Sequence, residues 1–325
     1  MARILAASEP GAIALAAAVL SDGGLVAFPT ETVYGLGADA LNPIAVARIF
    51  ESKGRPRFDP LIVHVADEAQ LGELVVDLPP NALALANRFW PGPLTLVLPK
   101  KAVVPDIVTA GLATVAVRIP AHPVALDLIR QTQRPIAAPS ANRFGRISPT
   151  YAAAVNEELG DAMNLVLDGG PCRIGVESTV IFFADNQPLL LRPGGLAVEE
   201  IEAIVGPVVI PELTEEQPLS PGRLPAHYAP RTPLAIWFGD NVATLGKRVG
   251  LLALQPPLNP RRFVAVEILS KDGDLIEAAA NLFAALRRLD RLGLDLILAE
   301  PVPNRGIGLA LNDRLRRASA GSEKR

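Results

Sequence analysis

Cysteine is nearly absent from this sequence, since Cys172 is the single one among 325 residues. One thiol excludes an intramolecular disulfide and a metal site built from several cysteines. Long apolar runs are also missing. The stretch 12–20 is preceded by Pro10 and closed by Asp22-Gly23-Gly24, which is typical of a short amphipathic helix, not of a membrane span or signal peptide. We therefore expect a globular protein of the cytoplasm that does not contact a membrane.

An excess of one charge is missing as well: 31 Lys and Arg face 34 Asp and Glu, for a net charge of −3. This balance argues against a protein that coats nucleic acid or a membrane surface. Residues 1–210 carry 15 cations against 21 acids, whereas residues 211–325 carry 16 against 13. Cations are thus the minority in the first part, and a cluster of them there indicates a specific task.

The usual phosphate-binding motifs are absent too, because no G-x-x-x-x-G-K-S/T occurs anywhere. Residues 35–40 match the dinucleotide motif G-x-G-x-x-A, but five residues separate Pro29 from the first glycine. The position about twenty residues later falls in a basic turn instead of on an acidic strand end. We expect residues 30–40 to form a ligand-contacting loop behind a buried strand, and any nucleotide site to be built another way.

The segment 53–65 combines three cations with an apolar run. Lys53, Arg55 and Arg57 lie among Gly54, Pro56 and Pro60, directly before the predicted strand 61–65. Glycine and proline favour a turn over a helix, so we expect the cations on an exposed turn at the mouth of a strand. Such a turn suits a multiply charged anion such as a nucleoside triphosphate. The alternative is a solvated basic turn without a ligand.

Short apolar runs predict many strands and few connecting helices in the first 210 residues. The expected strands are 25–29, 61–65, 94–98, 115–119, 136–138, 165–167, 179–183 and 189–192, with helices near 12–20, 43–52, 83–90, 123–132 and 149–159. This pattern favours a twisted, mixed α/β sheet over a doubly wound parallel sheet.

Prolines are frequent between 207 and 233, which predicts a semi-rigid, extended linker. We place a first domain at 1–210, the linker at 211–232 and a second domain at 233–325. In the second domain, expected strands 234–238, 249–254, 263–268 and 294–299 alternate with helices. The clearest helix begins after Asp274 as N-cap with Glu277 three residues later. This alternation predicts a small Rossmann-like α/β domain.

Several motifs together resemble one family. Residues 138–142 (A-P-S-A-N) place hydroxyl and amide groups at a strand end, although such a segment alone is more often a turn. Combined with K-G-R at 53–55 and P-T-E-T-V-Y-G-L-G at 29–37, it resembles the Sua5/YrdC/YciO family. The segment S-P-G-x-x-x-x-H-Y-A-P at 220–230, with the following domain, is similar to the two-domain Sua5 branch.

The resemblance implies threonylcarbamoyl-AMP synthase activity. L-threonine, bicarbonate or CO2, and ATP would form threonylcarbamoyl-adenylate and pyrophosphate, for the N6-threonylcarbamoyladenosine at position 37 of certain tRNAs. It also implies a YrdC-like twisted sheet around a concave cavity, Mg²⁺ bound with ATP, and tRNA or proteins of this modification pathway as partners. No metal ligand on the protein is assigned.

The site residues are carried over from the family's motifs. Lys53 and Arg55 match the family's cations that contact the nucleotide phosphates, and we give these two residues the catalytic role. The other residues at ATP-contacting positions are Asp59, Thr114, Ser140, Asn142, Ser148, Arg192 and Tyr228. Those at threonine-contacting positions are Thr32, His64, Arg118, Ala138 and Ser178. Arg118, at a strand end, can hold the amino-acid carboxylate with a two-pronged ion pair.

Two departures from the family's pattern affect the expectations. Asp59 stands where the family usually has Asn, and an acid near phosphates repels them unless it binds a metal or a cation. Arg223 stands where the linker motif usually has Met, which concerns how the linker docks. The resemblance places 220–230 over the mouth of the site, and we expect a lid with Tyr228 near the nucleotide. The alternative is that Tyr228 packs between the domains.

Two other functions remain open from the sequence. The first is a module that binds double-stranded RNA or tRNA without catalysis, through Lys100, Lys101, Arg143, Arg146 and Arg173. The acidic first domain and the few aromatic residues argue against it. The second is the related transfer of a carbamoyl group from carbamoyl phosphate, but the sequence lacks the acylphosphatase and zinc-finger portions of those larger relatives.

Overall fold

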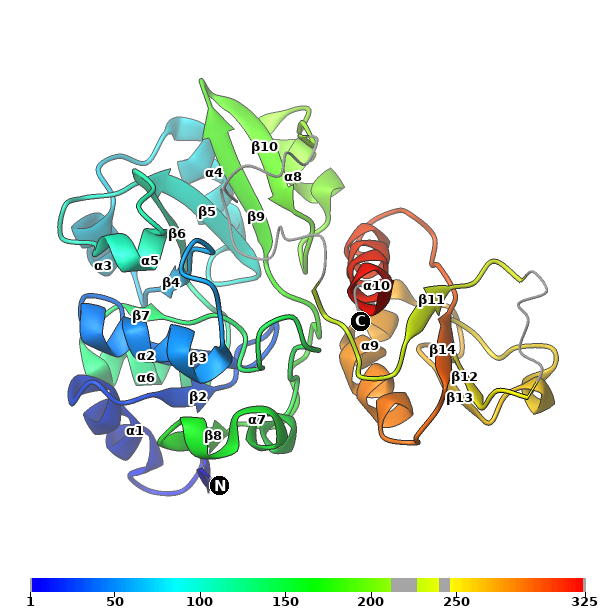
Figure 1. The fold of residues 1–325 in the computed structure, drawn as a ribbon. Coiled ribbons are helices and arrows are strands. Elements are labelled where there is room, and N and C mark those ends of the chain that lie inside the picture. Colours follow the sequence, from blue (N-terminus) through cyan, green and yellow to red (C-terminus); the bar gives the residue numbers. More distant parts are fainter. Residues whose placement is uncertain (1, 212–226, 240–245, 324–325) are drawn as a thin grey trace.

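The computed structural model describes residues 2–211, 227–239 and 246–323, which form two domains (Figure 1). The first domain contains a ten-stranded sheet and the second a four-stranded sheet. Most of the predicted linker, including Arg223, lies outside the described residues. Among the helices that the structure describes, none is long and apolar enough to cross a membrane.

The large sheet is mixed, as the sequence predicted. Its strands are β1 (Arg3–Ala6), β2 (Val26–Phe28), β3 (Gly35–Asp39), β4 (Ile62–His64), β5 (Leu94–Pro99), β6 (Thr114–Arg118), β7 (Ile136–Ala137), β8 (Leu165–Asp168), β9 (Thr179–Ala184) and β10 (Gln187–Arg192). They lie in the order β1-β8-β2-β3-β7-β4-β6-β5-β9-β10. Four neighbouring pairs are parallel and five are antiparallel.

The prediction that residues 30–40 form a loop is wrong in its second half. Residues 35–39 are strand β3, which pairs with β2 and β7. Gly37 of this strand serves packing, because a Cβ there would lie 2.7 Å from the ring of Phe28 and 2.8 Å from Ile136. A strand without side chains at these positions lets its neighbours close over it.

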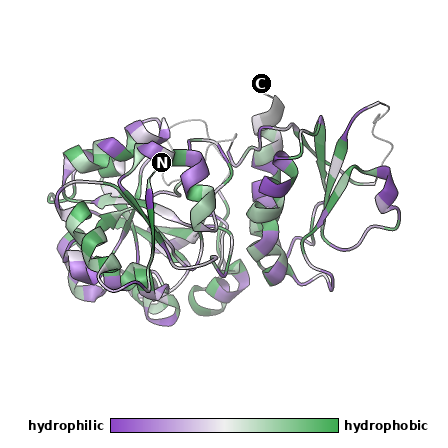
Figure 2. Cartoon of the chain, turned by 90° about the horizontal axis from the view of Figure 1, so that it is seen from below, coloured by the Kyte–Doolittle hydropathy of each residue, from purple (hydrophilic) through white to green (hydrophobic). Residues whose placement is uncertain are grey.

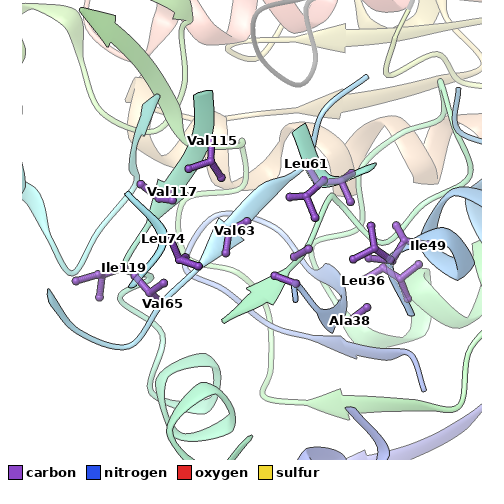
Figure 3. Packing of buried hydrophobic residues seen from close by; sticks show 14 of the residues in the cluster. Leu36, Ala38, Ile49, Leu61, Val63, Val65, Leu74, Val115, Val117 and Ile119 are labelled. Atoms are coloured by element: carbon purple, nitrogen blue, oxygen red, sulfur yellow. The ribbon is translucent and has the colours of Figure 1, made fainter. Parts of the chain in front are cut away.

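Helices cover the two faces of the large sheet unequally. One face carries α2 (Pro43–Lys53), α3 (Glu68–Leu74), α4 (Pro80–Phe89), α5 (Asp106–Thr109), α7 (Ala152–Leu159) and α8 (Val198–Val205) over the main core, part of which Figure 3 shows. On the other face, α1 (Ala12–Ser21) and α6 (Pro123–Thr132) pack on β1, β8 and β2. The remaining strands of this face carry a small separate cluster, formed by Ile62, Val97, Ala116, Val180 and Leu191. The helix-free half of this face is available for a site.

The second domain has the predicted Rossmann-like alternation. Its strands β11 (Leu234–Ile236), β12 (Val249–Ala253), β13 (Ala265–Ile268) and β14 (Leu296–Ala299) lie in the order β11-β14-β12-β13, and all neighbours are parallel. Helix α9 (Leu275–Asp290) begins as predicted, because the side chain of Asp274 accepts hydrogen bonds from the amides of Ile276 and Glu277. Helix α10 (Gly308–Glu323) follows β14.

Both helices of the second domain lie between its sheet and the first domain (Figures 1 and 2). The loop at Gly175 approaches α9 so closely that a Cβ there would lie 2.3 Å from the carbonyl oxygen of Ala279. Arg287 of α9 pairs with Glu158 of α7, with 2.9 Å between Nη1 and Oε1. One buried cluster joins the domains and includes Val33, Ile147, Val176, Tyr228, Leu282, Phe283 and Leu311.

Candidate active site

A pocket with about 530 Å³ of empty space lies at the helix-free half of the sheet face, next to the second domain. Residues of β4 and β6, the segments 30–35 and 138–140, residues 177–178 directly before β9, the end of β10 and residues 227–228 line it. The predicted site residues in this lining are Thr32, Arg55, His64, Arg118, Ala138, Ser140, Ser178, Arg192 and Tyr228. The fold therefore brings together residues that are up to 196 positions apart in the chain.

Strand geometry explains why polar side chains can face this pocket. Side chains alternate along a strand, so Ile62 and His64 of β4 line the pocket while Val63 lies in the main core. The parallel register sets His64 beside Arg118 of β6. The two residues that the sequence assigned to one ligand are thus direct neighbours across the sheet.

Buried groups of both charges with unused hydrogen-bonding capacity lie in one end of the pocket and directly behind it. The Nη1 of Arg118 lies 3.2 Å from the hydroxyl of Thr32 and 3.6 Å from Oε1 of Glu31. Within the described part of the chain, Nε of Arg118, Oε1 of Glu31 and Nδ1 of His64 have no hydrogen-bond partner. Buried polar atoms normally have partners. This end of the pocket is therefore arranged for a small polar ligand.

Burial sets the protonation of this end. It lowers the pKa of His64 well below the usual value, and the neighbouring Arg118 lowers it further. The imidazole is therefore neutral at pH 7 and can accept a hydrogen bond from a ligand. Burial also lowers the pKa of Arg118, while Glu31 raises it; a guanidinium nevertheless stays charged.

The other wall is held by Ser178 and Arg192. Arg192 donates from Nη2 to the carbonyl and hydroxyl of Ser178, at 2.9 and 3.1 Å. The Ser178 hydroxyl also lies 2.7 Å from that of Thr95 on β5. Thr95 was not predicted, and nothing in its sequence surroundings distinguishes it from other strand residues.

The prediction of an exposed basic turn is wrong for Lys53 and Arg55 and holds for Arg57 alone. Lys53 is the last residue of α2 and is 3% exposed, and Arg55 is 7% exposed. Gly54 ends the helix in the left-handed conformation, which turns the chain inward. The Lys53 ammonium donates to the carbonyls of Ser140 and Asn142. It therefore ties the two predicted motifs to each other.

The environment of Lys53 favours an anion nearby. Burial and then the neighbouring Arg55 lower its pKa well below the usual value. A phosphate group close to Lys53 and Arg55 would stabilise their charged forms. Asp59 is fully buried, and its Oδ2 lies 2.9 Å from Nη2 of Arg55. The acid that departs from the family's pattern thus pairs with a cation.

Five predicted residues are not in the pocket lining. Lys53 and Asp59 contact Ser140 and Arg55, respectively, which do line the pocket. Asn142 uses its amide to donate to the carbonyls of Arg143 and Arg146, at 2.7 and 3.0 Å. Thr114 begins β6 and by alternation shares the face of Arg118, which ends the strand. Ser148 lies behind the lining and donates a hydrogen bond to Glu177, which lines the pocket.

Glu177 is a functional candidate that the sequence did not assign to the site. Its carboxylate lines the pocket, accepts a hydrogen bond from Ser148 at 2.6 Å and pairs with Arg314 of α10 at 2.8 Å. Burial alone would raise its pKa, but Arg314, Arg192 and the Ser148 hydroxyl lower it to about 2. The group is therefore ionised at pH 7. Its proximity to Lys or Arg could not be read from spacing, because Arg314 lies 137 positions away.

His227 and Tyr228, at the end of the predicted linker, close the pocket on the side of the second domain. Tyr228 is 1% exposed, stacks on Phe283 of α9 and lies under the guanidinium of Arg314, 4.9 Å from its ring centre. Tyr228 therefore packs between the domains, as the alternative expected, and it also lines the pocket. The other residues of the expected lid, 220–226, lie outside the described residues.

The chain offers little to a metal ion. Among the residues that the structure describes, no three His, Cys, Asp or Glu side chains come together. Of the described residues that line the pocket, only Glu177 carries a carboxylate, and both of its oxygens are engaged. A metal ion here would take most of its ligands from a bound substrate.

The chain is similar to known proteins over nearly its whole length. A family model of the Sua5, YciO and YrdC proteins, described as "Telomere recombination", matches residues 18–194, and one described as "Threonylcarbamoyl-AMP synthase, C-terminal domain" matches residues 196–320. The threonylcarbamoyl-AMP synthases of Pyrococcus abyssi and Bacillus subtilis are each 48% identical to this chain; the alignments cover 96% and 95% of this chain, and 95% and 93% of theirs. The crystal structure of P. abyssi Sua5 complexed with L-threonine has a TM-score of 0.90 at 47% identity and covers 95% of this chain and 94% of its own.

Proposed function

Because this chain belongs to the Sua5/YciO/YrdC family and carries the C-terminal domain of its two-domain members, we propose that it is an L-threonylcarbamoyladenylate synthase. It is a nucleotidyltransferase that acts on L-threonine and ATP. Bicarbonate or CO2 is the third substrate of the proposed reaction, and threonylcarbamoyl-AMP and pyrophosphate are its products. The product would serve tRNA modification, with tRNA or the proteins of that pathway as partners. The supply of ATP and threonine favours the cytoplasm.

The observation that carries the proposal is the set of hydrogen-bonding groups that Thr32, His64 and Arg118 present at one end of the pocket. Threonine presents a carboxylate, an amine and a hydroxyl within one small molecule. Arg118 offers an unused Nε–H for the carboxylate. The neutral His64 can accept at one ring nitrogen and donate from the other, and the Thr32 hydroxyl lies beside Arg118. The ligand of the P. abyssi structure, L-threonine, fits this set of donors and acceptors.

The nucleotide would occupy the side of the pocket towards Arg55, Ser140 and Arg192. Arg55 is held by three contacts to Asp59 and Pro60, which fix the direction of its guanidinium. Ser140 is held from behind by Lys53, which donates to its carbonyl. Fixed donors of this kind stabilise the charge that develops during a phosphoryl transfer without having to reorganise.

The proposed reaction has two steps. The threonine amine adds to CO2 and loses one proton, which gives a carbamate. A carbamate oxygen then attacks the α-phosphorus of ATP, the bond to the β-phosphate oxygen breaks, and pyrophosphate leaves with its electron pair. The residues of the pocket bind and orient the two reactants, which supplies most of the catalysis in such a transfer. Mg²⁺ bound to the phosphates would neutralise charge on the leaving pyrophosphate.

Exclusion of water is the second task of the site, because a carbamate and a mixed anhydride both hydrolyse. His227 and Tyr228 cover the pocket from the second domain and are almost fully buried. They would therefore belong to a lid that protects both intermediates. Opening of this lid would be needed for product release.

RNA binding without catalysis has less support. Lys100 pairs with Asp106 at 2.6 Å, Lys101 donates to the carbonyl of Gly72, and Arg143 donates to the carbonyl of Glu158. These cations therefore have partners within the chain.

Pyrophosphate release tests the proposal, with threonine, bicarbonate and ATP omitted one at a time. We expect AMP-containing product and pyrophosphate only when all three are present. Release of ADP and inorganic phosphate would contradict the proposed chemistry. Salt-sensitive RNA affinity without nucleotide turnover would favour the binding module.

A further inference from the structure

We propose that Arg314, on α10 of the second domain, is a positioning residue for the adenylate-forming site in the first domain. It holds Glu177 and Tyr228 in place from behind the pocket. The second domain would then be part of the catalytic machinery and not only an anchor for the linker. This inference rests on the proposed function, since it names a residue that supports the same site.

The contacts of Arg314 all reach towards the pocket. The side chain is 1% exposed, and its Nε donates to Oε2 of Glu177 at 2.8 Å. Its Nη2 donates to the carbonyl of Pro193 at 3.0 Å, directly after Arg192. Its guanidinium lies 4.9 Å from the ring centre of Tyr228. One side chain thus contacts the loop before β9, the end of β10 and the end of the linker.

The guanidinium of Arg314 is held in position by residues of its own domain. Nη1 donates to Oδ2 of Asp313 at 2.6 Å, and Asp313 is held in turn by Arg317 at 2.9 Å. The planar guanidinium can therefore present its remaining N–H groups in a defined direction. Such precision is not needed to attach two domains, which the apolar cluster around Phe283 and the Arg287–Glu158 pair already join.

Glu177 explains what the contact does for the site. The charged and titratable groups that face its carboxylate are Arg314 and Asp313 of α10, Arg192 of β10, Lys53 of α2, and His227 and Tyr228 of the linker end. Without Arg314, the carboxylate would have Arg192 and Lys53 as its nearest positive partners. It would then compete with the phosphates of ATP for those cations. Arg314 pairs with the carboxylate from outside the pocket and prevents this competition.

The same pair predicts a pH signature. Burial raises the pKa of the Glu177 carboxyl, and Arg314 contributes the largest of the effects that oppose it. Removal of Arg314 therefore shifts this pKa upward, towards the range where the enzyme can be assayed. A residue that only joins the domains would not give this effect.

The test uses the full chain with Arg314→Gln, Arg314→Lys, Glu177→Gln and the double variant Arg314→Gln/Glu177→Gln. Arg316→Gln is the matched control, because Arg316 is exposed on the same helix and its side chain donates to the carbonyl of Asn312. Pyrophosphate release gives kcat and KM between about pH 5 and pH 9, and calorimetry gives the Kd of ATP. Thermal melting corrects each rate for the folded fraction.

We expect Arg314→Gln to lower kcat/KM for ATP about tenfold or more at pH 8 and to regain part of this loss as the pH falls, because a protonated Glu177 no longer competes with the phosphates. Arg314→Lys should retain a flat profile, because an ammonium still neutralises Glu177. In the Glu177→Gln background, Arg314→Gln should have a smaller effect and show no recovery at low pH. Arg316→Gln should behave as the unmodified chain.

A folded Arg314→Gln variant with unchanged kcat/KM and an unchanged pH profile would overturn the proposal. A lower melting temperature with unchanged rates per folded molecule would also do so, since it assigns Arg314 to stability alone. If Arg314→Gln does not fold, Arg314→Lys decides: it keeps the charge but loses the fork that reaches Pro193, and an unchanged Kd for ATP would refute the positioning role. Turnover by the unmodified chain tests the proposed function separately, and the ATP affinities report on Arg314 whichever reaction is catalysed.

Discussion

Arg118→Lys is the sharpest test of the threonine end of the pocket. The substitution keeps a positive charge beside Glu31 but removes the planar fork, including the Nε–H that has no partner among the described residues. A lysine can reach a carboxylate with one N–H group at a time. We expect a weaker hold on the threonine carboxylate and little change where ATP binds.

The magnitude follows from the contacts. A hydrogen bond to a charged group contributes about 1.5–3 kcal/mol, and each 1.36 kcal/mol corresponds to about a factor of ten. Loss of one such bond should therefore raise KM for threonine about 10- to 100-fold. Stability should fall much less than in Arg118→Met, because an unpaired Glu31 at 3% exposure would cost about 3–5 kcal/mol.

The assay is pyrophosphate release at varied threonine with saturating ATP and bicarbonate, and then at varied ATP. Arg130→Lys is the control, because Arg130 is exposed on α6 and pairs only with Asp127, at 3.6 Å, among the ion pairs of the described residues. Equal increases in KM for threonine and ATP would refute the assignment of Arg118 to the carboxylate. An unchanged KM for threonine would do the same.

Three further substitutions test other parts of the structure. Lys53→Met leaves two carbonyls without their donor, so the free energy of unfolding should fall by about 1–3 kcal/mol together with activity; an unchanged thermal midpoint would contradict the buried position of Lys53. Gly175→Ala should destabilise the chain by about 1–3 kcal/mol more than Gly170→Ala, because both glycines have positive φ but only Gly175 has a backbone atom, the Ala279 oxygen, within 2.3 Å of the new Cβ; equal melting temperatures would argue against the close contact. Burial lowers the pKa of His227 from 6.5 to about 3 in the folded state, so between these pH values the unfolded chain binds a proton that the folded chain does not. The contribution of His227 to stability should therefore fall by about 1.4 kcal/mol per pH unit below pH 6.5. Urea unfolding at pH 7 and pH 5 should show a loss of stability about 2 kcal/mol smaller in His227→Gln than in the unmodified chain.

Local pattern was sufficient to predict most elements of the fold. The helix after Asp274 and the strands around Val63 and Val117 follow from caps and alternation, which are properties of neighbouring residues. Strand β3 was missed because glycines weaken the strand signal, and the reason for them lies in Phe28, on the neighbouring strand. The short elements α3, α5, α8 and β1 were not predicted either, since their apolar pattern covers too few residues.

The site, too, contains residues that the sequence could predict and residues that it could not. Residues such as Thr32, His64 and Arg118 could be selected from motifs, and the fold brings them to one pocket. Burial of Lys53 could not be predicted, because it depends on the carbonyls of a segment 87 positions away. The Glu177–Arg314 pair could not be predicted for the same reason. Contacts between domains carry no short-range signal.

The two-sided packing of α9 has an evolutionary consequence. One side of this helix covers the sheet of its own domain, and the other receives Val33, Ile147 and Val176 of the first domain. The proline-rich segment suggests modules that recombination could exchange freely, but this helix makes them interdependent. A descendant that lost the second domain would expose an apolar surface and leave Glu177 without its cation. Such a lineage would have to acquire compensating substitutions at these positions, so they would be expected to change together with domain architecture.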